Sequence, residues 1–77
     1  MTLEERIERT GLRGYEFAAK IGMSEHRLYR LLNGRVKNIS PKDIKRISVG
    51  LKLKEEDVRA DLDRRANKHR IAEALAP

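Results

Sequence analysis

Cysteine is absent from this 77-residue chain, and His26 and His69 are its only histidines. Without cysteine, no disulfide or thiol chemistry is available, and two histidines this far apart do not suggest a zinc site. A glycine-rich phosphate loop and a Ser-His-Asp set with plausible spacing are also missing. We therefore expect no enzyme activity, no metal, no cofactor and no small-molecule substrate.

Long apolar runs are missing as well. Nothing in the sequence approaches about 18 consecutive apolar residues, and charges appear within the first few residues of the chain. We expect neither a signal peptide nor a membrane span, no membrane partner, and a cytoplasmic location. No segment shows the sustained period-two alternation of a half-buried strand, so we predict no sheet.

Helix signals are present along most of the chain. Thr2 and Glu5 have the spacing of a capping box, and Gly11 can end the helix that follows. Ser40 followed by Pro41 is a clear helix start, because proline at the first helical position loses no hydrogen bond there. A chain of this length forms one domain, which buries only about 60 to 65% of its unfolded surface. We predict a compact all-α domain of five helices, with a sixth possible at the C-terminal end.

The stretch from Tyr15 to Gly34 is the most informative part of the sequence. Phe17, Ala18 and Ile21 recur at helical spacing. Gly22 can then adopt the left-handed conformation that ends a helix, and a residue such as Ser24 can cap the next one. The sequence therefore predicts two short helices that meet at a glycine.

The second of these helices, residues 24–33, has one apolar and one polar side. At about 100° per residue, Leu28, Leu31 and Leu32 fall together and must face a core. The opposite side, with its two flanks, carries His26, Tyr29, Arg30, Asn33, Glu25 and Arg27. Most of these side chains donate hydrogen bonds and suit base edges or phosphates, although the same pattern also describes the solvated face of an ordinary surface helix.

The distribution of charge separates these two interpretations. The net charge is +6, and residues 24–46 hold seven basic against two acidic side chains, a net of +5. Residues 1–23 are neutral overall, and residues 47–77 have a net charge of +1. Positive charge concentrated on one helix and the segment after it is typical of nucleic-acid binding.

Residues 3 to about 62 resemble the helix-turn-helix domain of the Cro and repressor (Xre-like) family of bacterial and phage regulators. The family pattern runs Ala, three residues, Gly, an apolar residue, Ser, and then two apolar positions of the recognition helix. The matching residues here are Ala18, Gly22, Met23, Ser24, Leu28 and Leu31, followed by Asn33-Gly34-Arg35. The resemblance implies a compact lambda-repressor-like fold over residues 1–62 and a recognition helix in the major groove.

The resemblance also implies roles for individual residues. Base reading falls to Glu25, His26 and Arg30, with Arg27 as a further candidate on the flank of the helix. Phosphate contacts are predicted for Arg13, Tyr29, Asn33, Gly34, Arg35 and Lys37. The chain departs from the family at Arg13 and Gly14, where Ser or Thr and then a phosphate-binding Gln are usual. That phosphate contact either passes to Arg13 or is lost.

Residues 63–77 extend beyond the family core. A polar segment is followed by a small apolar patch that includes Ile71 and Leu75. The segment could continue the fifth helix, form a sixth or fray. Ile71 and Leu75 are candidates for a dimer contact, and a solvated or disordered tail is the alternative.

Two functions from different classes follow. The first is a sequence-specific regulator of transcription, favoured as a repressor, that binds double-stranded DNA as a homodimer on a palindromic operator with half-sites about 34 Å apart. The second is a protein-interaction module, such as an antitoxin-like or anti-repressor partner.

Overall fold

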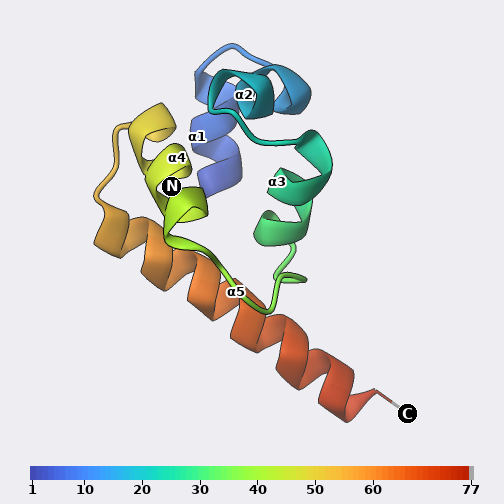
Figure 1. Cartoon of the computed structure of the whole chain (residues 1–77). Coiled ribbons are helices and arrows are strands. Elements are labelled where there is room, and N and C mark those ends of the chain that lie inside the picture. The colour runs from blue at the N-terminus through green and yellow to red at the C-terminus, as the bar shows by residue number, and fades with distance from the viewer. Residues whose placement is uncertain (77) are drawn as a thin grey trace.

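The computed structural model describes residues 1–76, which form five helices and no strand. In chain order the helices are α1 (Leu3–Arg9), α2 (Gly14–Lys20), α3 (Glu25–Leu32), α4 (Pro41–Leu51) and α5 (Glu55–Leu75). The predicted all-α, five-helix class is confirmed. No sixth helix occurs within the described residues, because the segment after residue 62 continues α5 (Figure 1).

The helix starts follow the local sequence signals. Thr2 Oγ1 accepts from the Glu5 amide at 3.1 Å while Glu5 Oε1 accepts from the Thr2 amide at 3.2 Å, so the capping box of α1 is complete. Ser24 Oγ accepts from the Arg27 amide at 3.2 Å at the start of α3. Between α2 and α3, Gly22 has φ +76°, and the Met23 amide donates to the Ala18 carbonyl. The turn between the two helices is therefore the one that the sequence predicts.

A single apolar core holds the helices together. Its largest fully buried side chains come from four helices: Phe17, Leu28, Leu31, Ile44, Ile47, Val58 and Leu62. Leu62 is the last buried residue along α5, which has 21 residues and is about 31 Å long. The C-terminal half of α5 therefore projects beyond the bundle, as Figure 1 shows.

The start of α4 is joined to the flank of α3 by a charged pair. Arg27 Nε donates to Asp43 Oδ1 at 3.1 Å, and Arg27 Nη2 donates to Asp43 Oδ2 at 2.6 Å. Asp43 is buried, and its Oδ2 also accepts from the Ser40 amide at 3.2 Å. The bonds from Arg27 and Ser40 hold the pKa of the Asp43 carboxyl below its usual range despite burial, and the pKa of Arg27 is raised because it donates to Asp43.

The end of α3 rests directly on α5. Gly34 has φ +72°, and a Cβ built there would lie 2.2 Å from the Arg65 carbonyl oxygen. Gly11 has a similar φ of +79° but nothing within 4 Å of its Cβ position. A side chain at Gly11 would therefore cause backbone strain alone, whereas one at Gly34 would cause both backbone strain and a clash with α5.

We expect Gly34→Ala to destabilise the protein far more than Gly11→Ala. Both substitutions place a side chain in the left-handed region, which costs about 1 to 2 kcal/mol. Only Gly34→Ala also pushes the α5 backbone away, so its total cost should exceed about 3 kcal/mol. Urea denaturation followed by circular dichroism measures both. Equal destabilisation by the two substitutions would show that the α3–α5 contact is not tight.

We expect Asp43→Asn to cost about 2 kcal/mol at pH 7, because it removes the ion pair and leaves the Arg27 guanidinium unpaired. The pKa of Asp43 is lower in the folded state than in the unfolded state. Its contribution to the free energy of unfolding is therefore complete above the unfolded pKa of about 3.9, and it is lost as the pH falls through the folded-state pKa. The difference between the variant and the wild type should therefore shrink below about pH 4. The exposed Asp63→Asn serves as the matched control and should change stability by no more than about 0.5 kcal/mol. A pH-independent difference for Asp43→Asn would contradict this account.

Candidate nucleic-acid interface

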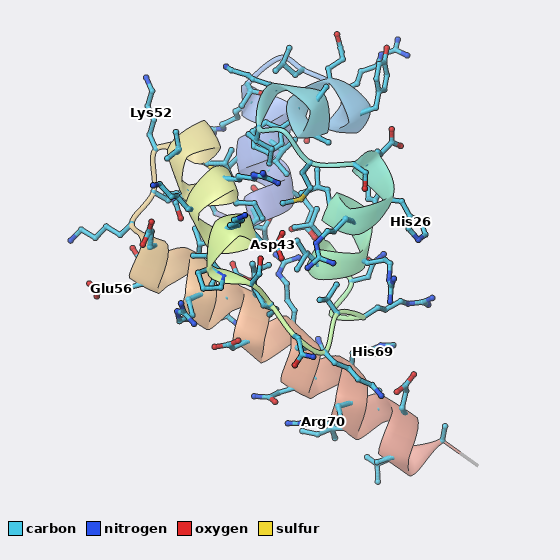
Figure 2. The ribbon with its side chains drawn as sticks, in the orientation of Figure 1. His26, Asp43, Lys52, Glu56, His69 and Arg70 are labelled. Atoms are coloured by element: carbon cyan, nitrogen blue, oxygen red, sulfur yellow. The ribbon has the colours of Figure 1, made fainter. Side chains whose placement is uncertain are left out.

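The outer face of α3 is exposed and polar. Leu28, Leu31 and Leu32 are buried against the core, which turns His26 and Arg30 outward. Figure 2 shows His26 projecting away from the bundle. Asn33, at the end of α3, and Glu25, in its first turn, are exposed too. The structure thus brings the predicted base-reading residues Glu25, His26 and Arg30 to one accessible surface.

Arg27 is also on α3, but its side chain is directed toward α4. Its guanidinium is directed at Asp43 on α4, with both carboxylate oxygens engaged. Its side chain is still 41% exposed, but the planar end that would meet a base edge is committed to this bidentate pair. The helical wheel placed Arg27 on a flank, and a pairing with a residue 16 positions away has no signal in the sequence.

Tyr29 reaches the start of α2. A Cβ built on Gly14 would lie 2.6 Å from the Tyr29 hydroxyl oxygen and 3.2 Å from its Cζ. The absence of a side chain at Gly14 therefore leaves the space that the tyrosine ring occupies. Tyr29 is 47% exposed, and Arg13, the residue before Gly14, is exposed as well. Gly14 thus leaves the Tyr29 hydroxyl group at the start of α2.

The segment after α3 alternates between exposed and buried residues. Arg35 and Lys37 are exposed, whereas Gly34 and Val36 are buried. The Gly34 amide donates to the Leu31 carbonyl at 3.2 Å and its backbone faces α5, and its phosphate contact stays a prediction. Gly34 therefore positions the loop, and the cations on either side of Val36 are the accessible groups.

Arg65 joins three helices, and the sequence does not reveal its partners. Its Nη1 and Nη2 each donate to a Glu4 carboxylate oxygen at 2.7 Å, Nη1 donates to the Leu32 carbonyl at 2.9 Å, and Nε donates to Asp61 Oδ1 at 2.6 Å. These bonds lower the pKa of Glu4 and raise that of Arg65. In the sequence, Arg65 is one of several basic residues in a polar run, and only its position identifies it.

The two residues predicted to form a dimer contact lie on the projecting part of α5. Ile71 is 59% exposed and Leu75 is 80% exposed, so neither contributes to the core. Among residues 1–76, no group of three or more potential ligands could hold a metal ion. Within the same residues, every helix is too short or too polar to cross a bilayer.

Comparison with known proteins agrees with this geometry. A family model described as a helix-turn-helix domain matches residues 1–62. No curated protein and no solved structure matches the chain. The matched region contains α1 to α4, the turn at Gly22 and the first part of α5. The model covers most of the 77 residues, and the chain belongs to the helix-turn-helix domain family.

Proposed function

We propose that this chain is a sequence-specific double-stranded DNA-binding regulator of the Cro/repressor (Xre-like) kind, acting as a repressor in the cytoplasm of a bacterium or a phage-infected cell. The observation that carries the proposal is the exposed polar face of α3 within a segment of net charge +5. An α-helix fits the major groove, and the surrounding cations supply attraction to phosphate. Membership of the helix-turn-helix family supports the same function.

Within this proposal, Arg30 and His26 read base edges and Glu25 assists at the start of α3. Arginine can donate two bonds to guanine, which is the commonest specific contact in the major groove. Arg27 is assigned a different role, because its bond to Asp43 holds α3 against α4. It acts as a positioning residue that sets the angle at which the reading face meets DNA.

Phosphate contacts are assigned to exposed groups around this face. Lys37 and Arg35 extend from the loop after α3, and Asn33 lies at the end of that helix. Tyr29 and Arg13 bind DNA phosphates on the α2 side. There the Tyr29 hydroxyl makes the phosphate contact that Gly14, without a side chain, does not make. These contacts fix the register of the protein on the duplex and carry no sequence information.

A reading helix of eight residues covers few base pairs, so specificity requires more than one copy. We propose a homodimer on a palindromic operator, with half-sites about 34 Å apart and Ile71 and Leu75 in the dimer contact. Their exposure supports this assignment.

We expect binding to duplex DNA to weaken steeply with salt. Each phosphate neutralised by the protein contributes about −0.9 to the slope of log affinity against log salt concentration. Fluorescence anisotropy with a labelled duplex of random sequence, titrated between about 50 and 300 mM NaCl, measures the slope. A flat response would refute DNA binding and favour a protein-interaction module.

We expect Arg30→Ala and Lys37→Ala to weaken binding in different ways. After selection of a preferred duplex from a random pool, Arg30→Ala should reduce discrimination against a scrambled duplex by about 1 to 3 kcal/mol. Lys37→Ala should weaken both duplexes equally and lower the salt slope by about 1. Arg59→Ala, an exposed change on the first half of α5, is the control and should alter neither quantity. Equal effects of Arg30→Ala and Lys37→Ala on both duplexes would refute the assigned division between base and phosphate contacts.

A further inference from the structure

Charge changes sign along α5. Residues 55–63 contain five acidic side chains and one basic, a net of −4. Residues 64–75 contain four basic side chains and one acidic, a net of +3 with histidine neutral. The helix is continuous across this boundary. Its acidic half packs in the bundle, whereas its basic half begins at the contacts of Arg65 with Glu4 and Gly34 and then projects beyond the bundle (Figure 1).

The basic half of α5 lies against the loop that carries the proposed phosphate contacts. Gly34 meets the α5 backbone at Arg65 and Ala66, so the loop passes directly over the helix at this point. Two grooves flank the crossing: one is lined by the end of α3 and by α5, and the other by the loop and by α5. The cations of α5 are therefore neighbours of the loop in space, although about 30 residues separate them in the chain.

The first groove contains Asn33 together with Arg64 and Lys68 of α5. Arg65 also lines this groove and is bonded to Glu4 and Asp61. Arg64 approaches Asp61 only at 3.4 Å, and its side chain is 73% exposed. Three cations, Arg64, Arg65 and Lys68, against these two carboxylates leave a net charge of +1 beside Asn33.

The second groove joins Arg35 and Lys37 of the loop to Arg70 of α5. Its two carboxylates are those of Asp63 and Glu73, and Glu73 Oε1 lies 3.1 Å from His69 Nε2. Figure 2 shows His69 beside the loop and Arg70 lower on the same helix. Three cations against two carboxylates leave this groove positive as well.

We propose that Arg64, Lys68 and Arg70 form a second nucleic-acid contact, which binds backbone phosphates next to those held by Asn33, Arg35 and Lys37. The inference rests on the proposed function and extends its binding surface. All three residues lie beyond residue 62, outside the region that the family model matches, so the contact is a property of this chain's own extension. At about 100° per residue, Arg64 and Lys68 lie about 40° apart around α5, whereas Arg70 lies about 160° from Lys68 in the other groove. Arg64 and Lys68 therefore bind phosphate on the Asn33 side, and Arg70 binds it on the side of Arg35 and Lys37, in a duplex that carries one negative charge per about 1.7 Å of its axis.

The test replaces the three cations by glutamine and compares the result with a matched control. The test variant is Arg64→Gln, Lys68→Gln and Arg70→Gln. The control is Lys52→Gln, Lys54→Gln and Arg59→Gln, which removes the same charge from exposed positions at the end of α4 and the start of α5. Figure 2 shows Lys52 on the opposite side of the molecule from Arg70. Glutamine keeps high helix propensity, so α5 should persist in both variants, which circular dichroism verifies.

Both variants and the wild type are titrated with salt on a selected 30-base-pair duplex and a scrambled one of equal length. We expect the test variant to lower the magnitude of the salt slope by about 0.9 for each phosphate that it no longer binds, up to about 2.7, on both duplexes. Its preference for the selected duplex should not change. A hydroxyl-radical footprint should lose protection at its outer phosphates only. The control variant should keep the wild-type slope and footprint.

Several outcomes would overturn the inference. An unchanged slope for the test variant, or an equal decrease in both variants, would mean that these residues make no local contact. Dissociation of the test variant into monomers in sedimentation would assign the effect to self-association through the extension. Salt-independent binding by the wild type would instead refute the proposed function itself, so the two failures are distinguishable.

Discussion

The arrangement of this small domain depends on the guanidinium group of Arg65. It donates to Glu4 on α1, to the Leu32 carbonyl at the end of α3 and to Asp61 on its own helix, so one side chain joins three helices. The planar group presents five donors in a fixed geometry, which suits simultaneous binding of two carboxylates and a carbonyl. The backbone of the same residue also faces Gly34. The end of α3 is therefore set both by hydrogen bonds and by direct backbone packing on α5.

The flank of α3 is held by Arg27, as its end is held by Arg65. Neither interaction covers the outer face of the helix. Arg27 binds Asp43 at the start of α4, while Arg65 and Gly34 hold the other end against α5. Both arginines are thereby engaged in ion pairs within the protein. What is left exposed on α3 and beyond it, from His26 to Lys37, is the surface that the proposed function uses. Rigid support of this kind is what a reading helix requires, because contacts to base edges depend on orientation.

The extension after residue 62 illustrates how composition alone can mislead. Residues 47–77 have a net charge of only +1, and this average conceals an acidic half and a basic half within one helix. The division of the chain at residue 62 remains a prediction, and α5 runs through that boundary without a break. The helix brings the basic half beside the end of α3 and the loop after it, a position that the sequence alone does not give.

The sequence by itself determined the local elements, because each of them depends on residues within one or two helical turns. It predicted the capping residues Thr2, Ser24 and Ser40, the turn at Gly22 and the apolar side of α3. It also predicted which face of α3 is exposed. The tertiary structure alone decided the partners of Arg27 and Arg65, the burial of Gly34 and the place of the Tyr29 ring over Gly14. Those interactions join residues far apart in the chain. An arginine bound to an aspartate on another helix and an arginine open to solvent look the same in a sequence, since only the packing of helices determines which carboxylate comes within reach.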